Sequence, residues 1–290
     1  MLMKKHLLFI FILLIVFVNE GCFAQSSKGH LVIIGGGKRH DYIMQKIVEL
    51  AGGKDARMIV IPNASSEPLE TALRQSNELK EHGAASSDYL IFTKESADAD
   101  SNLKKLEGVT GIFFSGGDQS NLTRDMLGTG LLEKVFEVYN SGGVISGISA
   151  GAAVMSEVMI TGNELINKDS ISAFISIQKN NIEVKQGLGF IKSAIIDQHF
   201  IKRKRNNRLI SLVIENPQLP GIAIDEATSI IVYPDDTFEV LGESQVLILD
   251  AGNAKNIRTD KNGNLRADNI KMHLLINGDK FNLKTKDVIE

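Results

Sequence analysis

Gly143-Val144-Ile145-Ser146-Gly147-Ile148-Ser149-Ala150-Gly151 is the segment most indicative of the fold, because in it a short apolar strand runs directly into a serine between two glycines. Small residues suited to a tightly packed helix follow, as far as Met155. Flanking glycines remove the Cβ clashes that forbid so sharp a strand-to-helix turn, and the turn holds the Ser149 hydroxyl at its tip. The stretch therefore predicts a nucleophile elbow. A glycine-rich turn with an incidental serine is the alternative that the motif alone leaves open.

Upstream of this elbow, apolar runs rich in β-branched residues alternate with amphipathic segments. The alternation predicts an α/β fold with a mostly parallel, doubly wound sheet that helices cover on both faces. Ligands bind such sheets at the carboxyl ends of the strands, where several glycine loops fall here. The runs predict strands, with their loops, at 31–37, 57–66, 88–92, 108–120 and 143–149, and helices at 40–52, 68–83 and 131–142.

Downstream of the elbow, the pattern predicts a strand, a basic helix and a second strand, and then an antiparallel ending. These elements fall at 193–200, 202–216 and 221–226, with antiparallel strands at 228–234, 237–243 and 245–251. Segment 271–284 predicts a hairpin that turns at Asn277-Gly278, and the polar stretch 253–269 predicts a flexible loop. No repeat or low-complexity linker interrupts the chain, so residues 25–290 are expected to form a single α/β domain.

Residues 1–24 have the features of a signal peptide. Two lysines precede an apolar stretch at 7–18, which is short for a membrane span, and small residues precede Gln25. We expect an exported protein, periplasmic or extracellular, without a membrane span after processing. A lipoprotein modified at Cys22 is a weaker alternative, because Glu20 is unlike the small or apolar residues usual at that position. An uncleaved membrane anchor ranks third.

Composition excludes several chemistries. The chain has one cysteine, Cys22, so neither a disulfide nor a cysteine nucleophile is expected in the processed protein. The formal net charge of −3 at pH 7 argues against a nucleic-acid partner. No histidine or carboxylate pair has the spacing of metal ligands on a helix face, so we expect neither a metal nor another cofactor.

The base that a serine nucleophile requires is predicted to be His199. This histidine closes the apolar run that begins at Ile196, at the sheet edge where Ser149 is also expected. Nucleophile and base must come within hydrogen-bond reach, and two neighbouring strand ends allow that.

The Gly116-Gly117-Asp118-Gln119 loop closes the strand before the elbow. Two glycines there let backbone amides approach a ligand, so the amides of Gly117 and Ala150 are candidates for an oxyanion hole. Gln119 is a candidate contact to the substrate backbone, while Asp118 also fits the role of a helix cap.

Two arginines, Arg203 and Arg205, follow His199 within about one helical turn. Either can clamp a substrate carboxylate through a bidentate contact. A structural ion pair is an equally good interpretation of each.

Taken together, four segments resemble one family, the cyanophycinases and their serine dipeptidase relatives such as aspartyl dipeptidase. The resemblance covers nearly the whole chain after residue 24 and implies a class I glutamine amidotransferase-like domain, of flavodoxin-like three-layer architecture, with serine in place of that family's cysteine. The segments are FFSGGDQ (113–119), GISAGAAVMS (147–156), GLGF with IDQHF and R-x-R-x-x-R-L (187–209), and GIAIDE (221–226).

By this resemblance the protein is a serine-type exopeptidase with Ser149 as nucleophile and His199 as general base. The third triad member in the family is a glutamate beyond the nucleophile helix, which makes Glu164 the first choice and Glu157 the fallback. The resemblance also implies a homodimer and the substrate cyanophycin, a poly-aspartate with arginines on its side chains that is cut into β-Asp-Arg dipeptides. Residues that match substrate-binding positions are Gln119, Asp197, Gln198, Arg203 and Arg205.

Three other functions stay open at this point. The same machinery can act on short aspartyl or isoaspartyl peptides. An α/β-hydrolase esterase shares the elbow and would use His273, although no HGGG-type oxyanion loop precedes the elbow. A non-catalytic binding protein on this fold is the third alternative.

Overall fold

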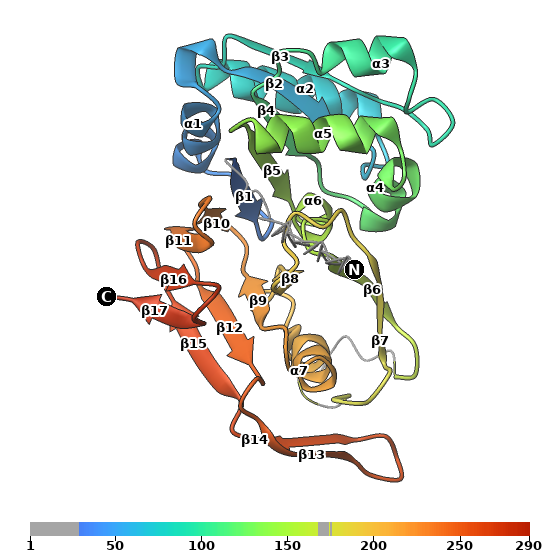
Figure 1. The fold of residues 1–290 in the computed structure, drawn as a ribbon, viewed down its shortest axis with the longest axis vertical. Coiled ribbons are helices and arrows are strands. Elements are labelled where there is room, and N and C mark those ends of the chain that lie inside the picture. The colour runs from blue at the N-terminus through green and yellow to red at the C-terminus, as the bar shows by residue number, and fades with distance from the viewer. Residues whose placement is uncertain (1–28, 168–173, 175) are drawn as a thin grey trace, which may run out of the picture.

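A nine-stranded sheet runs through the computed structural model, which describes residues 29–167, 174 and 176–290 (Figure 1). The predicted signal peptide lies outside these residues. One half of the sheet is parallel, in the order β1-β5-β4-β2-β3, and the other half, β10-β11-β16-β17, is antiparallel. The strands are β1 (His30–Ile34), β2 (Arg57–Ile61), β3 (Ser86–Tyr89), β4 (Gly111–Phe114), β5 (Val144–Ile148), β10 (Thr228–Val232), β11 (Thr237–Gly242), β16 (Lys280–Asn282) and β17 (Asp287–Ile289).

Helices cover both faces of the parallel half, as the alternating sequence pattern predicts. Successive residues of β1 enter two cores: Val32 and Ile34 pack with α1, while Leu31 and Ile33 belong to the core that α4 and α5 complete. This follows from the period of two along a strand, which sends neighbouring side chains to opposite faces. The helices are α1 (Asp41–Leu50), α2 (Pro68–Glu81), α3 (Asp100–Lys105), α4 (Gln119–Met126) and α5 (Gly130–Asn140), with a 3₁₀ turn, η1 (Gly53–Asp55).

A second sheet of four strands packs against the first through the main core. In the order β15-β12-β9-β8, it buries Ile196 and Ile222 in that core, while Ile195 and Ala223 face α7. Strands β8 and β9 are parallel, so their carboxyl ends lie at the same edge. The elements are β8 (Ile195–Gln198), β9 (Gly221–Ile224), β12 (Val246–Asp250), β15 (Lys271–Leu275) and α7 (Asn206–Glu215).

Two hairpins and one short helix complete the described chain. The strands β6 (Val158–Glu164) and β7 (Ile182–Gln186) pair with each other, as do β13 (Lys255–Thr259) and β14 (Leu265–Asp268). The helix α6 (Ala150–Ala153) follows β5. The fold is thus a mixed α/β fold with a central, largely parallel sheet and antiparallel strands.

Two local predictions for the C-terminal part are wrong. The stretch 253–269 contains the β13–β14 hairpin instead of a flexible loop. Every residue of β13 is exposed, so backbone pairing holds the strand without an apolar pattern that the sequence could reveal. The chain does turn near Asn277, but β15 pairs with β12 and β16 with β11. Alternation of apolar residues predicts strands, but it does not determine which strands pair with each other.

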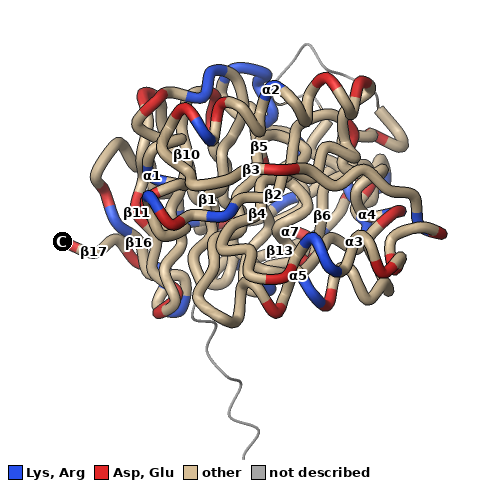
Figure 2. The backbone as a smooth tube through the Cα atoms, turned by 90° about the horizontal axis from the view of Figure 1, so that it is seen from above, with Lys and Arg blue, Asp and Glu red and all other residues tan. Residues whose placement is uncertain are grey.

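Charge is mixed over the molecule. Figure 2 shows Lys and Arg interspersed with Asp and Glu along the backbone. Within the described ranges, no helix is long and apolar enough to cross a membrane.

Candidate active site

Ser149 occupies the sharp strand-to-helix turn that the sequence predicts. It lies between β5 and α6 with φ 56° and ψ −108°, a conformation that non-glycine residues rarely adopt. The flanking glycines are required by packing: a Cβ on Gly147 would lie 2.4 Å from the Gly151 carbonyl oxygen, and one on Gly151 would lie 2.3 Å from the Phe114 carbonyl oxygen. The serine itself is half-buried. A strained backbone conformation therefore presents the hydroxyl at the carboxyl edge of the sheet.

A continuous chain of hydrogen bonds joins this serine to a histidine and a glutamate. The Ser149 Oγ lies 2.8 Å from His199 Nε2, and His199 Nδ1 lies 2.6 Å from Glu226 Oε1. An ionised carboxylate only accepts hydrogen bonds, so Nδ1 carries the ring proton and donates a hydrogen bond to Glu226. Nε2 is then free to accept from the serine hydroxyl, which is the tautomer that a general base needs.

Glu164, the first choice for the third residue, is not the partner of the histidine ring. Glu164 lies on β6, and its Oε1 accepts a hydrogen bond from Asn207 Nδ2 at 3.0 Å. Glu157, the fallback, is exposed. Both ring nitrogens of His199 are engaged by Ser149 and Glu226, so the expected pairing with Glu164 is corrected to Glu226.

The sequence did contain a signal for Glu226. This glutamate follows β9 by two residues, and β9 runs parallel to β8, which ends just before His199. Carboxyl ends of neighbouring parallel strands meet at one edge of a sheet. The acidic residue that closes GIAIDE was therefore a better candidate than one on a hairpin strand.

Burial sets the protonation state of His199, which is 5% exposed. Desolvation is the main cause that lowers its pKa, and the positive charges of Arg203 and Arg205 act in the same direction. The hydrogen bond to Glu226 and the charge of that carboxylate act in the opposite direction, yet the pKa stays below its ordinary value. The imidazole is thus neutral at neutral pH and available as a base.

The Gly116–Gly117 loop lies over the serine. A Cβ on Gly116 would lie 3.4 Å from Ser149 Cβ and 3.9 Å from Ser149 Oγ. Gly117 has φ 139°, and a Cβ there would lie only 1.9 Å from the carbonyl oxygen of Ala64. Glycine is thus needed at position 117 for the loop to pass the segment that follows β2, whereas a Cβ at position 116 would make ordinary van der Waals contact with Ser149.

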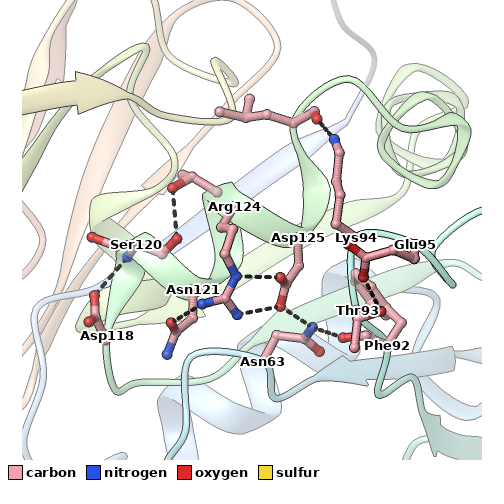
Figure 3. A network of polar contacts seen from close by, with 12 residues as sticks. Asn63, Phe92, Thr93, Lys94, Glu95, Asp118, Ser120, Asn121, Arg124 and Asp125 are labelled. Carbon is pink, nitrogen blue, oxygen red and sulfur yellow. Dashed lines mark hydrogen bonds and ion pairs between the residues drawn. The ribbon is translucent and has the colours of Figure 1, made fainter.

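The helix after this loop is held by side-chain hydrogen bonds (Figure 3). Asp118 caps α4 by accepting from the Ser120 amide at 2.8 Å, which confirms the capping interpretation. At the other end of α4, Asp125 accepts from Asn63 Nδ2 at 3.1 Å and from Arg124 Nε at 2.8 Å. Bonds at both ends of α4 therefore limit how far the loop at its start can move.

Gln119 and Asp197, two of the expected substrate contacts, are buried and bonded within the protein. Gln119 Nε2 donates to the carbonyl oxygens of Ile160 at 2.8 Å and Thr161 at 2.6 Å. The Asp197 side chain is fully buried and forms a bidentate ion pair with Arg208. These contacts tie α4 to β6 and α7 to β8.

The three other expected contacts lie around His199. Arg205 Nη1 donates to the carbonyl oxygen and to the Oε1 of Gln198, each at 2.7 Å. Burial, followed by the charge of Arg208, lowers the pKa of Arg205 to about 10. Arg203 is exposed in the turn after His199. Among the expected contacts, Arg203 is therefore the cation best exposed to an incoming substrate.

His273 does not take part in this arrangement. It lies on β15, opposite Ile248, with its ring edge-on to Phe281 at 5.4 Å between centroids. The Ser149 hydroxyl is hydrogen-bonded to His199 and not to His273, the base that the esterase alternative requires. In the described part of the chain, no group of three or more His, Cys, Asp or Glu is arranged to hold a metal ion.

A serine at a strand-to-helix turn, bonded to a buried neutral histidine at the carboxyl edge of a mixed α/β sheet, defines a serine-type hydrolase. Comparison with known proteins gives the family. Residues 31–241 match the model of peptidase family S51, and the chain belongs to that family. It is therefore a serine-type peptidase.

The relatives share most of the chain. The cyanophycinase of Synechococcus elongatus is 34% identical over 275 residues, which cover 91% of this chain and 82% of that protein. The cyanophycinase of Geminocystis herdmanii (strain PCC 6308) is 33% identical over 272 residues, covering 90% and 96%. The fold is similar to that of a peptidase from an acI-B1 Actinobacterium, with a TM-score of 0.65 and 21% identity over 89% of this chain and 98% of the other.

Proposed function

We propose that this chain hydrolyses peptide bonds through a Ser149–His199–Glu226 triad. The single observation that carries the proposal is the hydrogen-bond chain from Ser149 Oγ through the His199 ring to Glu226 Oε1, with distances of 2.8 Å and 2.6 Å. Both contacts are within the range that proton transfer and charge-assisted hydrogen bonding require.

In the first half of the reaction, Ser149 Oγ attacks the carbonyl carbon while its proton passes to His199 Nε2. The carboxylate of Glu226 holds Nδ1–H and stabilises the imidazolium that forms. When the tetrahedral intermediate collapses, Nε2 returns the proton to the departing amine. Water, activated by the same nitrogen, then attacks the acyl-enzyme and frees Ser149.

The amides of Gly117 and Ala150 are the proposed oxyanion donors. Ala150 is the first residue of α6, and an amide at that position has no intrahelical acceptor. The Gly116–Gly117 loop lies over Ser149 on the other side. Preorganised amides of this kind stabilise the negative oxygen without reorganising during the reaction.

The proposed substrate is cyanophycin, cut to β-Asp-Arg dipeptides. Support comes from the names of the relatives and from the exposed cation of Arg203 near the base, which suits a substrate carboxylate. Arg205, which donates hydrogen bonds to Gln198, is the second candidate for that contact. Gln119 is the proposed contact to the substrate backbone through its Oε1, since its Nε2 donates to Ile160 and Thr161. We also propose that residues 1–24 direct export of the protein, and that its fold is of the class I glutamine amidotransferase-like type.

The test of the nucleophile is Ser149→Ala, with Ser141→Ala as the matched control in the exposed turn before β5. We expect Ser149→Ala to abolish peptide hydrolysis and covalent labelling by a fluorophosphonate, with an unchanged thermal unfolding midpoint. Ser141→Ala should retain both activities. Hydrolysis by the Ser149→Ala protein would refute the mechanism.

The substrate is tested by supplying purified protein with cyanophycin and, separately, with α- and β-Asp-Arg dipeptides. Release of β-Asp-Arg from the polymer is the expected result. Cleavage of the dipeptides alone would instead identify a dipeptidase with the same machinery. Absence of labelling and of all cleavage would favour a non-catalytic binding protein.

A further inference from the structure

Three consecutive carbonyl groups, of the last residue of β1 and of the two glycines after it, each accept a hydrogen bond from one of the three segments that carry the proposed triad. Ile34 accepts from the Ser149 amide at 3.0 Å and Gly35 from the His199 amide at 2.9 Å. Gly36 accepts at 2.9 Å from the amide of Ala227, the residue after Glu226. Residues 34–36 contribute no side chain to the proposed chemistry, yet their carbonyls hold the three segments that do in fixed positions relative to one another.

Gly36 also lies directly against the His199 ring. It has φ 136°, and a Cβ built on it would lie 2.1 Å from Cε1 and 2.5 Å from both Nδ1 and Nε2 of that ring. To reach the 3.4 Å at which ordinary van der Waals contact begins, the ring would have to withdraw by about 1.3 Å. His199 is 5% exposed and both its ring nitrogens are bonded, so such a withdrawal breaks the contact to Ser149, the contact to Glu226, or both.

The neighbouring glycines meet other obstacles. A Cβ on Gly35 would lie 2.2 Å from the backbone oxygen of Asp225, while one on Gly37 would meet the flexible side chain of Glu226 at 2.8 Å. Among these three glycines, Gly36 alone has the imidazole as its nearest neighbour.

We propose that Gly36 is a positioning residue for the general base: its missing side chain is what allows His199 to bridge Ser149 and Glu226. The inference rests on the proposed function, because it assigns Gly36 a part in that same triad. Gly36 acts through the His199 ring and supplies no chemical group to the reaction. A side chain at this position removes the base from its catalytic distance, whereas the substrate-facing surface near Arg203 stays in place.

The test compares Gly36→Ala with Gly83→Ala. Gly83 also has a positive φ, 103°, but a Cβ there meets nothing within 4 Å, so this control reports the backbone cost alone. For Gly36→Ala we expect kcat to fall at least about 100-fold, as for a catalytic group misplaced by about 1 Å, with KM within about twofold of the parent value. The rate constant for fluorophosphonate labelling should fall in parallel. Gly83→Ala should leave all three values unchanged.

A double variant separates positioning from a general structural role. In a His199→Ala background the ring is gone, so adding Gly36→Ala should cause no further loss of labelling. In that background, Gly36→Ala should also lower the thermal unfolding midpoint by less than the same substitution lowers it in the parent protein. This comparison holds even if Gly36→Ala alone folds poorly, because removal of the ring makes room for the new methyl group.

Two results would overturn the proposal. One is a Gly36→Ala protein with kcat within about threefold of the parent. The other is an equal loss of stability from Gly36→Ala with and without the His199 ring. These two results can be told apart from a failure of the proposed function. An active Ser149→Ala protein refutes the triad. An inactive Ser149→Ala protein together with a fully active Gly36→Ala protein refutes only the role of Gly36.

Discussion

The assignment of the third triad residue makes the sharpest prediction, and Glu226→Gln tests it. The carboxylate of Glu226 lies 2.6 Å from His199 Nδ1 and is 28% exposed. An amide of the same shape removes the negative charge that stabilises the imidazolium. It can also turn its NH₂ group toward Nδ1, which moves the ring proton to Nε2 and prevents Nε2 from accepting from Ser149.

The expected loss in kcat is about 10³- to 10⁴-fold, the size seen when an orienting carboxylate becomes an amide in a serine–histidine triad. It corresponds to roughly 4–5.5 kcal/mol of transition-state stabilisation. Folding should change little, because the amide fills the same volume. The matched control is Glu164→Gln, since the new side chain can still accept from Asn207, and its kcat should stay within about threefold of the parent value.

The assay is steady-state hydrolysis together with the rate of fluorophosphonate labelling, with thermal unfolding as the check on the fold. The reasoning is refuted if Glu226→Gln keeps more than about a tenth of the parent kcat. A large loss in Glu164→Gln without loss of stability would restore the residue first expected from the sequence.

Three further predictions concern the groups around the base. Replacing Asp197 by Asn leaves the buried Arg208 charge without its partner and should lower the free energy of unfolding, measured in urea, by about 3–5 kcal/mol. The control Glu137→Gln breaks an exposed ion pair and should cost at most about 1 kcal/mol. Equally small effects of the two substitutions would contradict the structural role of the Asp197–Arg208 pair. The pKa of His199 is lowered, so the acidic limb of kcat/KM should lie below pH 6.5. Arg203→Gln removes a positive charge that disfavours the imidazolium, so that limb should move to higher pH, and a shift to lower pH would contradict the assignment of His199 as the base.

Much of the fold could be predicted because the parallel strands are buried on both faces. A strand such as β1 is then a continuous apolar run, and amphipathic helices separate the runs. The positions of the C-terminal strands in the sheets were harder to predict, because their sequences indicate strands but not which strands they pair with. The hairpin β13–β14 was missed because it buries no apolar face.

The sharp strand-to-helix turn at Ser149 and the capping role of Asp118 could also be predicted, since each depends on local backbone geometry. A G-x-S-x-G turn needs its glycines whatever surrounds it, and an aspartate before a helix caps it through contacts two residues away. Glu226 and Gly36 could not be found in this way. Their relation to His199 spans 27 residues and more along the chain, across three strands of two sheets.

The class of fold, the sharp turn that presents Ser149 and the strand end that carries His199 could all be predicted from the sequence alone, because burial patterns and tight turns are properties of short segments. The tertiary structure was needed to show which glutamate faces the histidine, that Asp197 is bonded to Arg208, and that Gly36, two residues after β1, packs against the His199 ring. Those relations depend on how the four-stranded sheet docks at the end of β1. The position of that sheet is determined by many buried contacts together, and any one short segment of sequence contributes only a few of them.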